Sequence, residues 1–208
     1  MTNGIRSKHT ADSGTSTRAN RQHRVRWLAL AILGLGLFVG VVDSSVVSVA
    51  TPAMQEDFQA VESEMLLVVT VYSLAFASSV LLLGKAGHRL GLRQMFALGA
   101  ALFGASSLLI GLAPSIGFTN GMRAVAGVAA AMSAVSGLAL VQGIFAGEER
   151  ALAFGIWGAA ASLGAALGPL LGGWAVTYAS WRWAFFINVP ACLVIVSGSY
   201  LWIAEVQH

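Results

Sequence analysis

The sequence predicts an all-α membrane protein with six transmembrane helices, and three observations support this fold class. Hydrophobic residues make up 57% of the 208 residues and charged residues only 10%, whereas soluble domains carry roughly a quarter charged residues. The apolar residues gather in six stretches, and about 20 such residues suffice to cross a bilayer as a helix. The chain also holds 24 glycines, a residue enriched where membrane helices pack closely.

The six expected spans follow one another between charged or turn-forming connections. They cover residues 27–50, 65–83, 94–112, 121–144, 151–177 and 183–204. The first stretch is longer than the apolar core of a cleaved signal peptide, about 7–15 residues, and contains Asp43. We therefore expect it to be retained as the first helix.

The segment before the first span differs in composition from the rest of the chain. Residues 1–26 are rich in Ser, Thr, Arg and Asn and lack an apolar period. Such a segment cannot bury enough apolar surface to fold alone, so it is predicted to be a disordered basic tail. The chain thus divides into a tail over 1–26 and a membrane domain over 27–208.

Lys and Arg are distributed unevenly among the connections, and this predicts the orientation. They occur in the tail, in the connection after the second span and, as Arg150, after the fourth, whereas residues 52–64 carry four acids and no base. Arg182 is the exception. By the positive-inside rule, both termini are expected to lie in the cytoplasm, in a multi-pass protein of the plasma (inner) membrane.

Two charged residues, Asp43 and Arg123, lie inside predicted spans. A lone charge at membrane depth costs about 2.5–3.5 kcal/mol, so such residues usually pair or line a wet cavity. Asp43 comes late in an outward-running helix and Arg123 early in an inward-running one, so their depths match. Two interpretations remain open: a titratable proton relay, or a structural ion pair between two helices.

Glycines recur every fourth residue in the fifth span. Gly164, Gly168 and Gly172 form one smooth stripe on a helix, with Pro169 among them and Gly173 beside them. A stripe of this kind lets another helix approach closely within a membrane. We expect bulky substitutions at Gly168 to be more harmful than those at Gly198, near the end of the sixth span.

The motifs of common enzymes and metal sites are absent from the sequence. It contains no HExxH, P-loop or GxSxG pattern, and Val39 stands where the third glycine of a dinucleotide fingerprint beginning at Gly34 would be. No histidine lies in any span to act as a base for a serine nucleophile. We therefore expect no enzymatic activity, no metal, no cofactor and no nucleic-acid partner.

Five segments together resemble the major facilitator superfamily, and most closely its fourteen-helix drug:proton antiporter branch. Residues 42–52 are similar to the first-helix motif of that branch, with Asp43 as its acid, and residues 123–127 resemble the arginine motif linked to proton coupling. Residues 164–173 match the fifth-helix antiporter motif, and residues 180–190 resemble the segment entering helix six.

The fifth resemblance lies between the second and third spans. The superfamily's cytoplasmic loop signature, which gates the transporter, resembles the segment that carries Gly84, Lys85, His88, Arg89, Gly91 and Arg93. Three positions depart from the family pattern, since His88 replaces an aspartate, Ala126 a glutamine and Ser48 an asparagine. Each departure removes a polar partner that the resemblance would supply.

The resemblance implies the N-terminal six-helix half of a proton-coupled secondary transporter of the multidrug efflux type. Asp43 and Arg123 are then the proton-coupling candidates, and the partners are the lipid bilayer, protons and hydrophobic or cationic small molecules. The missing C-terminal half, or a second copy, is expected to pack on the glycine stripe. Without it, the face carrying Asp43 and Arg123 is expected to meet lipid. The alternatives are a non-transporting truncated six-helix module, an assembly partner, or a half-transporter that works as a homodimer.

Overall fold

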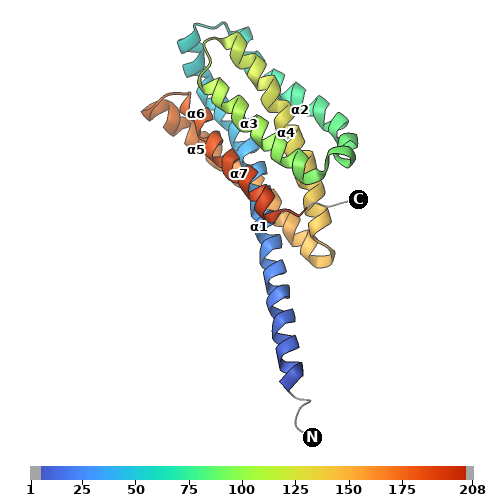
Figure 1. Cartoon of the computed structure of the whole chain (residues 1–208). Helices are drawn as coiled ribbons and strands as arrows, with labels where there is room; N and C mark the ends of the chain where they lie inside the picture. The colour runs from blue at the N-terminus through green and yellow to red at the C-terminus, as the bar shows by residue number, and fades with distance from the viewer. Residues whose placement is uncertain (1–5, 205–208) are drawn as a thin grey trace.

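The computed structural model describes residues 6–204, and for residues 6–20, 22 and 85–90 it describes the backbone alone. Its elements are α1 (Arg6–Phe58), α2 (Glu62–Leu90), α3 (Leu92–Gly111), α4 (Ile116–Ile144), α5 (Gly147–Tyr178), α6 (Trp183–Phe186) and α7 (Asn188–Trp202). The helices form one bundle, from which the first part of α1 projects as a single helix (Figure 1).

The six predicted spans are confirmed within the described residues. Six helical segments are long and apolar enough to cross a membrane, the last of them formed by α6 and α7 together. α1 begins at Arg6, inside the segment predicted to be a tail, and runs without interruption through Pro52. The disorder of residues 1–26 stays a prediction.

Short connections hold neighbouring helices antiparallel, and local hydrogen bonds define where the helices begin. The Ser115 hydroxyl accepts a hydrogen bond from the Phe118 backbone N–H at 3.3 Å and so caps α4. The Glu64 carboxylate accepts one from the Val61 backbone N–H at 3.1 Å at the start of α2. These polar side chains satisfy donors that lack a partner within the first helical turn.

The predicted loop between the second and third spans is mostly helical. α2 continues to Leu90 and α3 begins at Leu92, so Gly91 alone is non-helical between them. Its φ of 80° lies in the region that residues with a side chain rarely adopt. The glycine therefore permits an abrupt turn where a longer loop would otherwise be needed. The side chains of Lys85, His88 and Arg89 lie outside the described residues.

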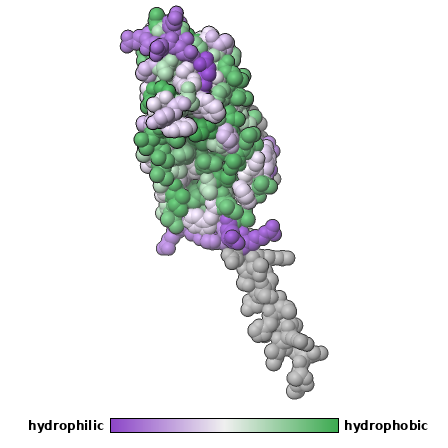
Figure 2. All heavy atoms as spheres, turned by 90° about the vertical axis from the view of Figure 1, so that its left-hand side faces the viewer, coloured by the Kyte–Doolittle hydropathy of each residue, from purple (hydrophilic) through white to green (hydrophobic). Residues whose placement is uncertain are grey.

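The outer surface carries the pattern expected of a protein in a bilayer. Figure 2 shows hydrophobic residues over the middle of the bundle and hydrophilic residues at its two ends. Large apolar side chains such as Leu66, Leu81 and Leu170 are exposed on it. In water such a surface would promote association, so lipid is the solvent that fits it.

Among the residues whose side chains are described, the interior holds two apolar clusters, one toward each end of the bundle. The first includes Leu33, Phe96 and Ile195, and the second includes Val46 and Phe185. On α1 the first cluster reaches Val39 and the second begins at Val42. Asp43 therefore lies where the two clusters meet, enclosed by protein on both sides.

Candidate functional site: a buried ion pair beside a cavity

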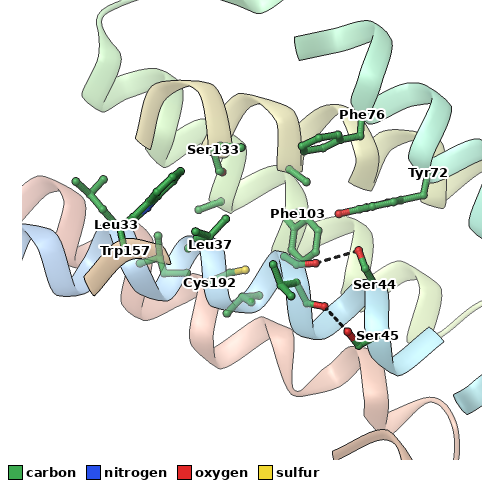
Figure 3. Close-up of a pocket in the computed structure, with 18 of the residues that line it drawn as sticks. Leu33, Leu37, Ser44, Ser45, Tyr72, Phe76, Phe103, Ser133, Trp157 and Cys192 are labelled. Carbon is green, nitrogen blue, oxygen red and sulfur yellow. Dashed lines mark hydrogen bonds between the residues drawn. The ribbon is translucent and has the colours of Figure 1, made fainter. Parts of the chain in front are cut away.

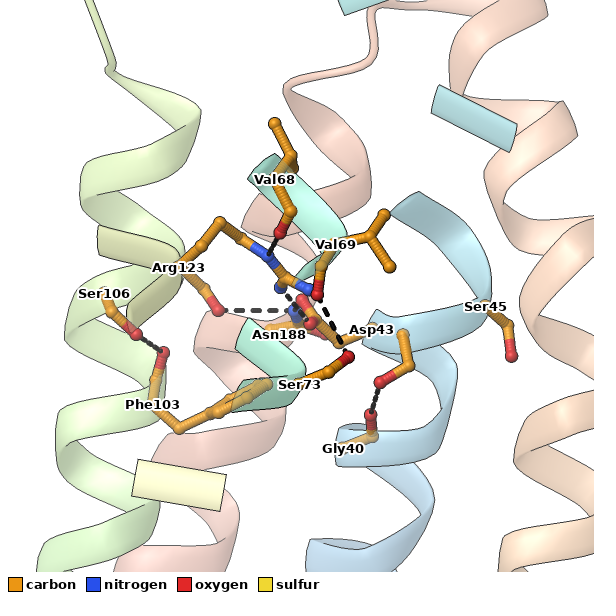
Figure 4. A network of polar contacts seen from close by, with 12 residues as sticks. Gly40, Asp43, Ser45, Val68, Val69, Ser73, Phe103, Ser106, Arg123 and Asn188 are labelled. Atoms are coloured by element: carbon orange, nitrogen blue, oxygen red, sulfur yellow. Dashed lines mark hydrogen bonds and ion pairs between the residues drawn. The ribbon is translucent and has the colours of Figure 1, made fainter. Parts of the chain in front are cut away.

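Asp43 of α1 and Arg123 of α4 form an ion pair inside the bundle (Figure 4). The Arg123 Nη1 donates to Asp43 Oδ2 at 2.5 Å, and the side chains of both residues are 1% exposed. The Arg123 Nε donates to the Val68 carbonyl of α2 at 3.1 Å. The matched depths inferred from the sequence thus correspond to direct contact between two fully buried charges.

The burial of this pair corrects the expectation that the two charges alone would face lipid. The six helices already enclose Asp43 and Arg123, because α2 covers the pair through Val68 and Tyr72 while α7 covers it through Asn188. No second bundle is needed to remove these charges from the membrane. A buried pair persists only when further hydrogen bonds satisfy its remaining polar atoms, and Val68 and Asn188 supply such bonds.

Asn188 completes the polar group from the start of α7. Its Nδ2 donates to Asp43 Oδ1 at 3.0 Å and to the Ser107 Oγ of α3 at 3.3 Å. Asn188 and Ser107 are both buried. Four helices therefore contribute a side chain to one connected network, which we call the polar core: Asp43, Ser107, Arg123 and Asn188.

Tyr72 separates the polar core from a cavity of about 310 Å³ between the helices. Its ring packs against the guanidinium of Arg123, with Cζ 4.1 Å from the ring centroid. The cavity wall is mostly apolar and aromatic, with contributions from Phe76, Phe103 and Trp157 (Figure 3). Its polar lining comes from Tyr72 and four serines: Ser44, Ser45, Ser73 and Ser133. Apolar walls with a few hydroxyls suit a mostly hydrophobic small molecule.

The glycine stripe of α5 is a helix-packing face, as predicted, but its partner is different from the one expected. A Cβ at Gly164 would lie 2.9 Å from the Phe38 carbonyl, and one at Gly168 would overlap the Ser45 Cβ. One at Gly172 would lie 3.3 Å from the Val46 Cα. The stripe thus packs on α1 of the same bundle, and the expectation that it contacts a missing half is wrong.

Pro169 and Gly173 lie beside the stripe on α5. α5 is continuous through Pro169, so the proline does not break the helix. A Cβ at Gly173 would meet no atom within 4 Å. Only the glycines of the stripe itself are required by the contact with α1.

Gly198 lies at a close contact that the sequence does not reveal. A Cβ there would lie 2.5 Å from the Ile32 Cδ1 and 3.2 Å from the Trp202 ring. The closest atom is the end of a flexible side chain, which can move more easily than backbone. Gly198 is therefore constrained, though by a softer neighbour than Gly168.

Arg182, the exception to the charge pattern, is paired with an acid. Its Nη1 lies 2.6 Å from Asp57 Oδ2, and the Trp181 indole N–H donates to the same oxygen at 3.1 Å. Asp57 lies at the end of α1 and Arg182 just before α6, so these connections share one end of the bundle. The pairing offsets the positive charge of Arg182 at an end that otherwise carries acids.

Sequence reasoning missed Asn188 and Tyr72 as members of the site. For Asn188 a signal was present, because a primary amide in an apolar run must find a partner within the membrane. Its place near the start of the sixth span matches the depth of Asp43 and Arg123. For Tyr72 no comparable signal exists, since aromatic residues are common throughout membrane helices.

A model of the Major Facilitator Superfamily matches residues 33–208. The chain belongs to this superfamily. It is 38% identical over 177 residues to the puromycin resistance protein pur8 of Streptomyces alboniger, a match that covers 85% of this chain and 35% of that protein. It is 36% identical over 188 residues to the multidrug efflux pump LfrA of Mycolicibacterium smegmatis, covering 90% and 37% respectively.

These relatives indicate the class of protein and show how much of a relative's length the chain matches. The family and its members indicate a transporter and not an enzyme. The chain spans about a third of the length of the curated relatives it matches. It therefore matches one part of these longer members of the superfamily.

Solved structures show the same fold. A bacterial homologue of the human lysosomal transporter Spinster, in an inward-facing and unoccupied conformation, matches with a TM-score of 0.71 at 17% identity. That match covers 86% of this chain and 42% of the other. The peptide transporter POT matches with a TM-score of 0.74 at 15% identity, covering 83% and 37%. The predicted all-α fold is thus confirmed, and the family match identifies it as one part of a major-facilitator fold.

Proposed function

We propose that this chain is the N-terminal six-helix half of a proton-coupled multidrug exporter of the fourteen-helix antiporter branch. The single observation that carries the proposal is the buried ion pair of Asp43 and Arg123 beside a largely apolar cavity. The cavity offers a surface for hydrophobic or cationic compounds, and the acid offers a group that can take up and release a proton. The efflux and resistance functions of LfrA and pur8 support this class of substrate.

Alternating access requires a second bundle, because the cavity must close on one side while it opens on the other. The exposure of α2 and α5 supports the proposal that a second bundle is missing. Only 17% of the most apolar stretch of each of these helices is buried inside the bundle. In α3 and α4 the corresponding values are 61% and 56%. We propose that α2 and α5 receive the missing C-terminal half, or a second copy of the chain.

The protein is proposed to lie in the plasma membrane with both termini in the cytoplasm. The acids of residues 52–64 and the uncharged connection at 113–120 then face outward, while Gly91 and Arg150 face inward. The pairing of Arg182 with Asp57 supports this arrangement, because the one outward base is neutralised.

Reporter fusions test this topology directly. We expect a fusion after residue 60 to report the outer compartment and a fusion after residue 208 to report the cytoplasm. An alkaline phosphatase and a fluorescent protein reporter, each placed at both sites, should give opposite signals. Signals from the same side at both sites would contradict the proposed topology.

A transport assay tests the proposed function. We expect the chain alone in proteoliposomes, under an imposed proton gradient, not to move a fluorescent cationic drug above the level of protein-free vesicles. Co-reconstitution with a second six-helix bundle is expected to produce gradient-dependent movement that Asp43→Asn abolishes. Movement by the chain alone that disappears in Asp43→Asn would establish a homodimeric half-transporter. No movement in either preparation would instead favour a non-transporting module or an assembly partner.

A further inference from the structure

Asn188 contacts Asp43, the acid of the polar core, through its side-chain amide, which can act as either a hydrogen-bond donor or an acceptor. The two N–H bonds of its Nδ2 point to different acceptors. One is Asp43 Oδ1 at 3.0 Å (Figure 4), and the other is Ser107 Oγ at 3.3 Å. A primary amide carries a donor group and an acceptor oxygen of nearly equal shape. A half-turn of the amide would place Oδ1, with its two lone pairs, where Nδ2 now lies.

Arg123, which also donates to Asp43, differs in this respect. Arg123 has only N–H donors and stays charged in proteins, so it always donates to Asp43 Oδ2. Ser107 carries a hydroxyl, which can accept a hydrogen bond from Asn188 or donate one to it. Asn188 and Ser107 can therefore change from a donor arrangement to an acceptor arrangement together, while Arg123 keeps its bond.

We propose that Asn188 and Ser107 form a reversible hydrogen-bond switch that stabilises both protonation states of Asp43. With Asp43 ionised, the Asn188 amide donates to Oδ1 and to Ser107, as the structure shows. When a proton from the cavity binds Oδ1, that O–H donates to the turned amide oxygen, and the Ser107 O–H donates to the same oxygen. Arg123 continues to donate to Oδ2, now the carbonyl oxygen of the acid. The two hydrogen bonds of the Asn188 amide with Asp43 and Ser107 are thus reversed, and one proton is gained.

The surroundings of Asp43 make such a switch necessary. The charged or titratable groups that face it within the described part of the chain are Arg123 from α4, Tyr72 from α2 and Cys192 from α7. Arg123 has no acceptor atom, and burial excludes bulk water from Asp43, which is 2% exposed. A protonated acid without an acceptor here would leave a buried O–H unsatisfied, which is energetically unfavourable. Asn188 is thus a positioning residue for the coupling acid, an assignment that rests on the proposed function.

Infrared difference spectroscopy of the purified full chain tests the switch without any need for transport. Asparagine labelled with ¹³C in the side-chain amide separates that amide band from the backbone, and the pH is lowered over the range in which the protein stays folded. We expect a carboxylic acid band that Asp43→Asn abolishes, and an Asn amide change with the same midpoint. Asn188→Leu should abolish the amide change and shift the acid band. Ser107→Ala, which keeps the Asn188 amide, should retain a smaller amide change.

The control is Ser199→Ala on the same helix, because Ser199 is also buried but its hydroxyl donates to the Val196 carbonyl, outside the polar core. It should leave both bands unchanged. An Asp43 acid band that titrates with no Asn188 amide change would overturn the switch, as would the absence of any Asp43-dependent acid band. Both measurements need only the wild-type chain and a variant without the Asp43 carboxyl, so they remain decisive even where Asn188→Leu fails to fold. Where Asp43→Asn is too unstable, Asp43→Asn combined with Arg123→Met takes its place. Failure of the proposed function has a different signature, namely gradient-driven transport that survives Asp43→Asn.

Discussion

Replacing Asp43 by asparagine is expected to lower the free energy of unfolding of the chain by about 3–5 kcal/mol. The substitution keeps the size of the side chain but leaves the guanidinium of Arg123, 1% exposed, without a counter-charge. The hydrogen bond to Val68 and the ring of Tyr72 remain, but neither neutralises a buried cation. Unfolding of the purified chain in mixed micelles, followed by tryptophan fluorescence, measures the loss.

A double variant separates the structural and the coupling roles of the pair. Asp43→Asn combined with Arg123→Met removes both charges and keeps similar volumes, so it should recover most of the lost stability. If Asp43 is the proton-carrying acid that we propose, gradient-driven export by the assembled two-bundle transporter should remain absent. A stable double variant that still transports would show that the pair only holds α1 and α4 together. Equal instability of the single and double variants would contradict the energetic argument itself.

The spans and the ion pair were predictable from the sequence because their signals are local. A stretch of apolar residues must be helical in lipid, since every backbone polar group needs a partner within its own segment. A charge within such a stretch must also find a partner, and Asp43 and Arg123 were the candidates at matching depths. These constraints follow from the solvent and do not depend on how the helices are arranged.

The partners of each helix face were less predictable, because they depend on rotation and tilt within the bundle. The glycine stripe marks a close approach, but the spacing of Gly164, Gly168 and Gly172 is the same whichever helix it meets. The structure places α1 there, within the same bundle. The position of Asn188 in an apolar run likewise indicates that its amide needs a hydrogen-bond partner. That the partners are Asp43 and Ser107 follows from how α7 packs against α1 and α3.

The second large effect is expected at Gly168, where alanine should destabilise the chain by about 1–3 kcal/mol. The added Cβ would overlap the Cβ of Ser45, which is attached directly to the backbone of α1. It cannot turn away as the end of a flexible side chain can, so α1 and α5 must move apart. At Gly198 the closest atom is the flexible Ile32 Cδ1, and the loss should be smaller.

Gly173→Ala provides the matched control on the same helix, since its Cβ would meet no atom within 4 Å. It should leave the free energy of unfolding unchanged or slightly higher, because alanine favours the helix over glycine by up to about 1 kcal/mol. The overlap also predicts a specific rescue: Ser45→Gly removes the obstructing Cβ and should restore much of the stability lost in Gly168→Ala. Equal tolerance at Gly168 and Gly173, or no recovery in the double variant, would mean that the stripe does not set the distance between α1 and α5.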